Sequence, residues 1–135
     1  MENSVSLMEP AAQCALLDDL FAAFNRHDVA GVIGTMTGDV VFEGAAGPDV
    51  FGVRFSGRAA VGEAFAKVFR DLPDVRWDDV QHYPAGQHAV STWTMRATRP
   101  DGARIEVEGI DFFTLRDDKV SLKRAFRKDR PPLRL

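Results

Sequence analysis

The sequence predicts an α+β domain in which helices come first and an antiparallel sheet follows. Apolar residues recur at helical spacing in three segments that precede Pro73. From residue 75 to residue 128 the pattern changes to short alternating segments that are separated by turn residues. Helices segregated from consecutive strands indicate helices that pack on one face of a curved sheet.

Three helices follow from the apolar spacing. The first is expected from Ala11 to Asn25, and Asp28 is placed to cap a second, short helix whose apolar stripe ends at Met36. The third is expected from Arg58 to Leu72, because Pro73 stops a helix.

The strands are expected to be short. Residues 39–43 are β-branched and aromatic, which indicates a strand that leads into a glycine-rich loop at 44–57. That loop is either a mobile apolar cover or a plain surface loop. Four further strands are expected at 75–83, 88–98, 104–115 and 120–128.

The amino-acid composition limits the number of domains and the classes of function that this chain can have. With 135 residues, 45% hydrophobic and 27% charged, one domain is expected at 11–128, between flexible termini at 1–10 and 129–135. The formal net charge of −3 gives no basic field for nucleic acid. The chain shows no signal peptide and no apolar run that spans a membrane, so no membrane partner is expected.

The single cysteine, Cys14, allows no intrachain disulfide and no zinc-ligand spacing. A reducing, cytoplasmic setting is therefore expected, with no metal and no cofactor.

The turn sequence between the 88–98 and 104–115 strands predicts the register in which these two strands pair. Pro100-Asp101-Gly102 suits a three-residue loop that pairs Arg99 with Ala103. This register sets Trp93 opposite Gly109, so that the indole meets the residue without a side chain, and it sets Ser91 opposite Asp111.

Asp111 is the one carboxylate on the apolar side of its strand. A carboxylate among apolar residues is desolvated, so it is protonated unless a cation or several donors hold its charge. Such a destabilising position suggests a function. We expect a cavity face formed by Ser91, Trp93, Met95, Asp111 and Phe113, closed by helical residues Leu20, Phe24 and Phe65.

The last hairpin leaves two registers open. A two-residue Asp117-Asp118 loop puts Arg124 opposite Asp111, which predicts a structural ion pair. A loop extended by Lys119 puts Ala125 there and leaves the carboxyl in an apolar cavity. The second register also gathers apolar side chains on the outer face, which suits a homodimer contact; these are Ile110, Phe112, Leu122 and Phe126.

Several short segments together are typical of one family of folds. They are AAFNRHD (22–28), DVVFE (39–43), GRAAV (57–61), GIDFF (109–113), KV (119–120) and RAF (124–126). On these segments the chain resembles the SnoaL-like and ketosteroid-isomerase-like branch of the nuclear transport factor two superfamily. The resemblance implies a cone-shaped fold with an apolar pocket, into which Phe42 and Phe55 are also expected to point.

The resemblance implies several chemistries. Ketosteroid isomerases use an Asp base, a Tyr and a protonated Asp; Asp111 resembles the protonated donor, but the base falls near Gly44 and the Tyr near Leu20. SnoaL-like polyketide cyclases use a pocket Asp as acid or base in an aldol step, which suits Asp111. Members similar to limonene-epoxide hydrolase need an Arg beside the Asp, and alternation turns Arg96 away from the pocket.

These observations give two hypotheses. The first is a cyclase or isomerase that transfers a proton on an apolar carbonyl compound, with Asp111 as acid, base or donor. The second is a non-catalytic binding or dimerisation module of the same fold. His82 and His88 have no evident carboxylate partner, so they are expected at solvent-facing or edge positions.

Overall fold

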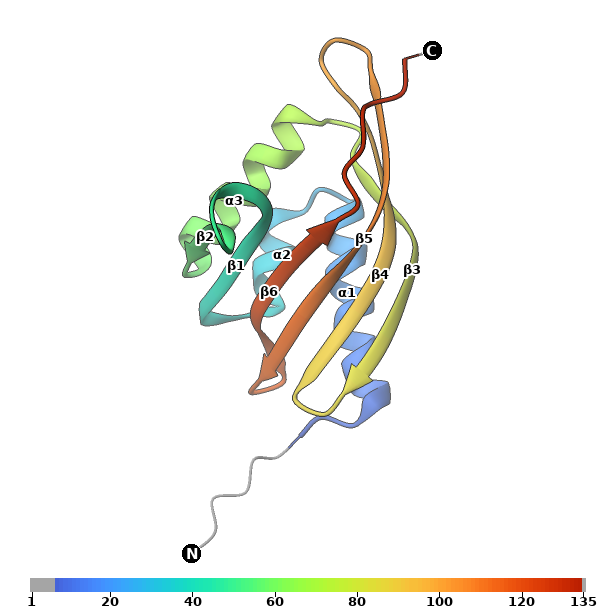
Figure 1. The fold of residues 1–135 in the computed structure, drawn as a ribbon. Coiled ribbons are helices and arrows are strands. Elements are labelled where there is room, and N and C mark those ends of the chain that lie inside the picture. Colours follow the sequence, from blue (N-terminus) through green and yellow to red (C-terminus); the bar gives the residue numbers. More distant parts are fainter. Residues whose placement is uncertain (1–6, 135) are drawn as a thin grey trace, which may run out of the picture.

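A curved sheet wraps around helices that lie on one of its faces (Figure 1). The computed structural model describes residues 7–134, so most of the expected flexible terminus at 1–10 lies outside the described residues. The α+β architecture is confirmed. Its elements are α1 (Pro10–Asn25), α2 (Val29–Gly34), β1 (Met36–Asp49), β2 (Gly52–Ser56), α3 (Arg58–Asp71), β3 (Arg76–Ala85), β4 (His88–Thr98), β5 (Arg104–Arg116) and β6 (Lys119–Arg127).

The sheet joins the two halves of the chain through β1. The strand order is β2-β1-β6-β5-β4-β3, and β1 pairs with β6 in parallel while the other pairs are antiparallel. This pairing sets Phe42 of β1 beside Lys123 of β6. Residues distant in sequence therefore meet on the inner face.

The helix boundaries follow local chemistry. Pro10 begins α1, where its missing N–H costs nothing. Asp28 caps α2 as predicted, because its Oδ1 accepts a hydrogen bond of 3.0 Å from the Gly31 backbone N–H. The expectation that Met36 belongs to this helix is wrong, since α2 ends at Gly34 and Met36 pairs with Val120 in the sheet.

The glycine-rich segment is a hairpin rather than a loop. β1 continues to Asp49, and β2 folds back so that Glu43 pairs with Arg54. Gly52 has a φ of +81°, and a Cβ there would lie 2.3 Å from the Gly44 carbonyl oxygen. The glycines that suggested a loop therefore permit a tight turn and a close backbone approach within paired strands.

The β4–β5 register agrees with the prediction. Ser91 pairs with Asp111 and Trp93 pairs with Gly109. A Cβ on Gly109 would lie 2.5 Å from Cη2 of the Trp93 indole, so the indole occupies the space that any side chain would need.

The β5–β6 register pairs Asp111 with Ala125, which is the second of the two registers expected. It arises from a bulge and not from a longer loop. Asp117 and Asp118 form a two-residue turn with φ values of 55° and 60°, and this turn pairs Arg116 with Lys119. A bulge then shifts the pairing between Thr114 and Leu115, which brings Ala125 opposite Asp111.

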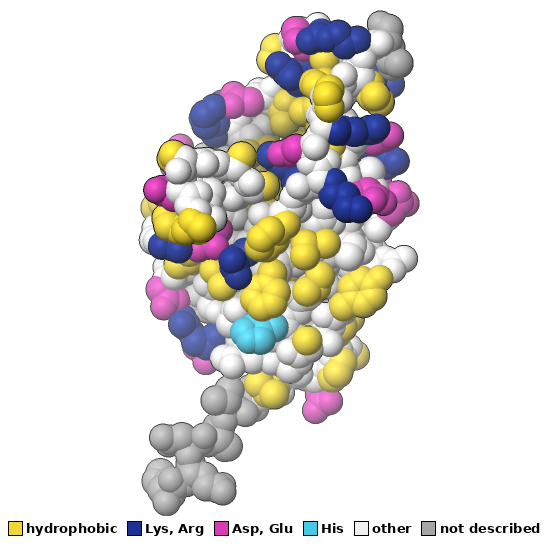
Figure 2. All heavy atoms as spheres, viewed as in Figure 1, with side chains coloured by type: hydrophobic (Ala, Val, Ile, Leu, Met, Phe, Trp, Pro, Cys, Tyr) yellow, Lys and Arg dark blue, Asp and Glu magenta, His cyan; other side chains and the backbone are white. Residues whose placement is uncertain are grey.

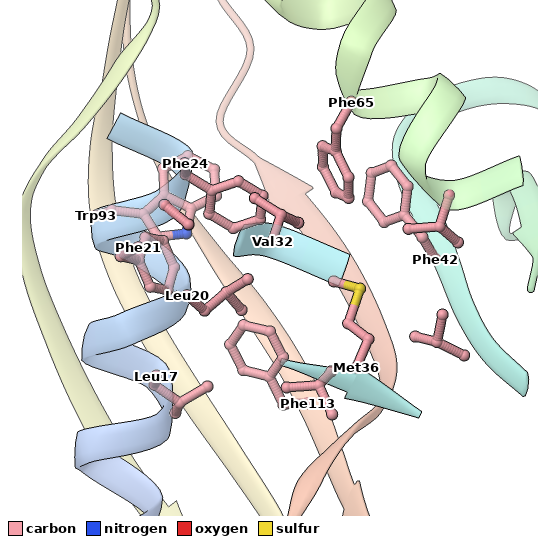
Figure 3. Packing of buried hydrophobic residues seen from close by; sticks show 14 of the residues in the cluster. Leu17, Leu20, Phe21, Phe24, Val32, Met36, Phe42, Phe65, Trp93 and Phe113 are labelled. Carbon is pink, nitrogen blue, oxygen red and sulfur yellow. The ribbon is translucent and has the colours of Figure 1, made fainter. Parts of the chain in front are cut away.

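The core lies between the inner face of the sheet and the helices. Figure 3 shows Phe42 of β1 and Phe65 of α3 facing each other, with their ring centroids 4.6 Å apart. Phe24 of α1 lies 5.0 Å from Phe65 by the same measure, which joins α1 to this group. Within the described residues, no helix is both long and apolar enough to cross a membrane.

The described part of the C-terminal segment forms hydrogen bonds with β5. The backbones of Leu133 and Arg104 exchange two hydrogen bonds, of 2.8 and 2.9 Å. Arg130 also donates to the Glu106 carbonyl at 2.9 Å. The reason is that β6 ends at Arg127 while β5 begins at Arg104, so the segment after β6 covers the exposed edge of β5.

Candidate functional site

A row of polar side chains crosses the otherwise apolar inner face of the sheet. Ser91 of β4 pairs with His82 of β3 on one side and with Asp111 of β5 on the other. Directly paired residues point to the same face, so the three side chains follow one another across the strands. On β6, Ala125 continues the row, and alternation places Lys123 on the same face.

Asp111 is held as a paired carboxylate. Its side chain is 1% exposed, and its Oδ1 accepts a hydrogen bond of 2.8 Å from the Lys123 ammonium. Its Oδ2 accepts one of 3.0 Å from the Trp93 indole N–H. The carboxyl group therefore has a cation and a neutral donor as partners, and it does not lie alone in an apolar cavity as one of the two expected registers implied.

The ion pair between Asp111 and Arg124, which the first of the two open registers predicts, does not form. Arg124 lies on the opposite face, where its Nε donates to Glu43 at 2.9 Å. Arg54 donates to the same carboxylate at 2.8 Å. Glu43 therefore points away from the inner face, as strand alternation with Phe42 predicts.

Lys123 is the functional candidate that the sequence analysis missed. Its side chain is 7% exposed, and its Nζ lies 4.7 Å from the ring centroid of Phe42. The corresponding distances to Phe24 and Phe65 are 5.3 and 5.5 Å. These distances lie within the range of cation–π contacts. Strand alternation could have identified Lys123 from the sequence, because a register with Ala125 opposite Asp111 puts Lys123 on the inner face.

A cavity of about 690 Å³ opens beside this lysine. Of the residues expected at a ligand pocket, Phe42, Phe55, Phe65, Trp93 and Met95 line it together with Lys123. Asp111 is not among the lining residues and meets the cavity only through its two hydrogen-bond donors. The other expected residues do not line it and are buried in the core behind it: Leu20, Phe24, Ser91 and Phe113.

His82 lies on β3, the edge strand of the sheet, as one of the two expected positions requires, but its side chain does not face solvent. Its side chain is 8% exposed. Its Nδ1 lies 2.7 Å from the Ser91 hydroxyl, and its Nε2 lies 2.9 Å from Asp18 of α1. The carboxylate of Asp18 belongs to a helix 64 residues away in sequence, so no local sequence pattern predicts this contact. His88 is exposed and lies 3.1 Å from the Thr114 hydroxyl.

Arg96 is kept out of the site by ion pairs on the other face of the sheet. It donates to Asp78 at 2.8 Å and to Glu106 at 3.0 Å. Burial raises the pKa of Asp78, but hydrogen bonds from Arg76 and Arg96 outweigh it and hold that pKa below its ordinary value. The arginine and aspartate that an epoxide hydrolase needs are therefore not brought together.

The described residues offer no evident metal centre. Between residues 7 and 134, no group of three or more His, Cys, Asp or Glu side chains is placed to hold an ion. The buried part of the cavity offers one ammonium, the carboxylate behind it and an apolar wall.

Comparison with solved structures shows the same fold in several proteins. A candidate polyketide cyclase from Xanthomonas campestris pv. campestris aligns with a TM-score of 0.77 at 19% identity, covering 86% of this chain and 90% of that one. A candidate isomerase from Bacillus subtilis aligns with 0.75 at 15% identity, covering 87% of each chain. TerC, co-crystallised with polyporic acid, aligns with 0.73 at 21% identity, covering 85% and 90%.

The sequence itself also identifies a family. A search of curated proteins finds no match. The family profile of the SnoaL-like domain matches residues 17–122, a region that extends from α1 into β6. Since this match spans most of the chain and the fold agrees with it, the protein belongs to the SnoaL-like domain family.

Proposed function

We propose that this protein is a small-molecule enzyme that moves a proton on an apolar cyclic carbonyl compound held in the cavity. The observation that carries the proposal is the buried Asp111–Lys123 pair, whose ammonium reaches the wall of a cavity that is aromatic and aliphatic apart from exposed charged residues at its mouth. Perturbed or paired charges in an apolar cleft are the groups that enzymes use to stabilise charge developing in a reaction.

The proposed chemistry depends on which member of the Asp111–Lys123 pair faces the ligand. A solvent base, water or hydroxide, takes the proton from the carbon next to the carbonyl group; the C–H electron pair stays on the substrate and forms an enolate, whose negative charge lies largely on oxygen. An oxygen beside Nζ of Lys123 would be stabilised by an N–H donor in a site of low dielectric constant. In this proposal Lys123 is the catalytic residue, and Asp111 positions it through the hydrogen bond of 2.8 Å.

The size and lining of the cavity support an apolar cyclic ligand. Its volume of about 690 Å³ falls within the usual range for small-molecule sites. Aromatic side chains from β1, β2, α3 and β4 contribute flat apolar walls; these are Phe42, Phe55, Phe65 and Trp93. The structural neighbours support the same class of ligand, since they include candidate polyketide cyclases and a protein co-crystallised with polyporic acid.

A non-catalytic binding module is the second candidate, and one observation favours it. By the resemblance to ketosteroid isomerases, the base falls near Gly44 and the tyrosine near Leu20, and neither of these two residues can transfer a proton. The two candidates differ in outcome, because a binding module holds the ligand without accelerating any proton exchange.

Deuterium exchange into 2-tetralone, an enolisable bicyclic ketone, tests the proposal. In deuterated buffer, proton NMR follows the loss of the signals next to the carbonyl group. The protein should accelerate this loss over buffer. The double variant D111N/K123M, which removes both buried charges together, should lose at least about tenfold of that acceleration, as for one oxyanion donor.

A lysine on the same strand provides the matched control. Lys119 begins β6 and donates to the Gly34 carbonyl at 3.0 Å, outside the cavity lining. K119M should therefore exchange as the wild type does. Binding of 2-tetralone without acceleration would reject the enzymatic proposal in favour of the binding module.

A further inference from the structure

The ammonium of Lys123 has more N–H donors than it has acceptors in the described protein. A lysine ammonium has three N–H donors. One donates to Oδ1 of Asp111 at 2.8 Å, and no second oxygen within residues 7–134 accepts from Nζ. The remaining surroundings are the ring faces of Phe24, Phe42 and Phe65. Two donors of a buried cation are therefore left without an oxygen or nitrogen acceptor from the described protein.

The carboxylate that balances the charge is withdrawn from the cavity. Asp111 is 1% exposed, and both of its oxygens are occupied by Lys123 and Trp93. Its two partners line the cavity, while Asp111 itself does not. A ligand therefore meets donors and a positive charge before it meets the negative one.

No other buried charge competes with this lysine. Among the lining residues, Lys123 is the only charged one that is buried. The remaining charged ones are exposed and are screened by water at the mouth of the cavity; they are Glu63, Lys67, Arg70, Asp71 and Arg127. The inner wall thus presents a single cation in an apolar setting.

We propose that the cavity selects organic anions, namely bicyclic or polycyclic compounds whose ring system carries an ionised oxygen as a carboxylate, phenolate or enolate. This proposal rests on the proposed function for the cavity and adds the charge state of the ligand before any reaction. An ionised oxygen satisfies the free N–H donors of Lys123, whereas a neutral hydrocarbon leaves them unpaired. A cationic ligand of the same shape is rejected by charge repulsion.

Three matched probes test the proposal: 2-naphthoate, 2-naphthamide and 2-naphthylmethylammonium share one ring system and differ in charge. Protein-observed NMR titration at pH 7 gives each dissociation constant and reports on the Trp93 indole N–H, which lies at the site. The naphthoate should bind at least about tenfold more tightly than the amide, as expected for a charge-assisted hydrogen bond. The ammonium probe should bind most weakly.

Variants assign the preference to Lys123. K123M alone leaves Asp111 buried without its cation and can fail to fold, so the informative variant is D111N/K123M, in which no buried charge is left unpaired. This variant should bind naphthoate and naphthamide with equal affinity. K119M, on the same strand but outside the cavity, should keep the wild-type preference.

The outcomes separate this inference from the proposed function. Equal affinity of the wild type for naphthoate and naphthamide would overturn the anion selectivity while leaving the cavity as a ligand site. A naphthoate preference that survives in D111N/K123M would also overturn it. Absence of binding by all three probes at millimolar concentration would remove the ligand site itself, and with it the proposed function.

Discussion

Nζ of Lys123 lies 2.8 Å from Oδ1 of Asp111, and the two side chains are 7% and 1% exposed. The partners come from adjacent strands, with Ala125 rather than Lys123 directly opposite the aspartate. The pair therefore lies diagonally across β5 and β6, within the reach of a long lysine side chain.

The pair gives a stability prediction. K123M should lower the free energy of unfolding by about 3–5 kcal/mol, because it leaves an uncompensated carboxylate in the core. D111N/K123M should recover most of that loss, since neither residue then carries a charge. Urea denaturation followed by tryptophan fluorescence measures all three proteins. A double variant no more stable than K123M would contradict the interpretation of the pair as mutually compensating charges.

A second prediction concerns the glycine beneath the indole. G109A should destabilise the protein by about 2–3 kcal/mol, because the new Cβ would lie 2.5 Å both from the Trp93 ring and from the Phe126 carbonyl oxygen. Trp93 must then move, so the tryptophan emission should change as well. G38A is the matched control within β1, where nothing lies within 4 Å of the added Cβ. Equal unfolding midpoints for G109A and G38A would refute this packing argument.

A third prediction uses the pH dependence of stability. Hydrogen bonds from the Thr98 hydroxyl and backbone N–H lower the pKa of Asp74 from its ordinary value of 3.8. A lowered folded-state pKa means that Asp74 contributes stability above pH 3.8, and that this contribution disappears as the pH falls through the folded-state value.

Thermal denaturation of D74N measures that contribution. The variant should have a Tm about 2–4 °C below the wild type at pH 6, and the difference should shrink as the pH falls below about 3.8. D19N, at an exposed position on α1, serves as a control for removal of one negative charge. A difference that stays constant down to pH 2 would show that the hydrogen bonds do not depend on ionisation.

The outer face of the sheet leads to a prediction about oligomeric state. Figure 2 shows hydrophobic side chains gathered on this face over β4, β5 and β6. Phe126 is 46% exposed there, and it pairs with Ile110 across the strands. We propose that a second copy of the chain covers this face, because an apolar patch of this kind suits a self-complementary contact.

Sedimentation velocity at about 100 µM tests that contact. The wild type should sediment as a dimer of the 14.9 kDa chain, and F126D should sediment as a monomer. V50D is the control, since Val50 is fully exposed at the β1–β2 turn and does not belong to β4, β5 or β6. A wild-type protein that remains monomeric would exclude the dimer.

Local pattern was sufficient for most of the fold. Helical spacing located α1 and α3, the Asp28 cap was read directly, and the Pro100-Asp101-Gly102 turn fixed the pairing of Ser91 with Asp111. Each of these features depends on residues that are neighbours in sequence or that meet across one short turn. The predictions failed where the composition indicated a loop but the backbone forms paired strands, as in the glycine-rich segment that forms β2 and the end of β1.

The sequence alone determined that an acid at position 111 lies on the apolar face of a curved sheet and that helices cover this face, because strand alternation and helical periodicity are short-range properties. Only the tertiary structure decided what surrounds that acid. A single bulge moved Arg124 to the outer face and Lys123 to the inner one, and the parallel pairing of β1 with β6 brought Phe42 to the ammonium. A one-residue shift exchanges the two faces of a strand, so the partner of a buried charge depends on the final register.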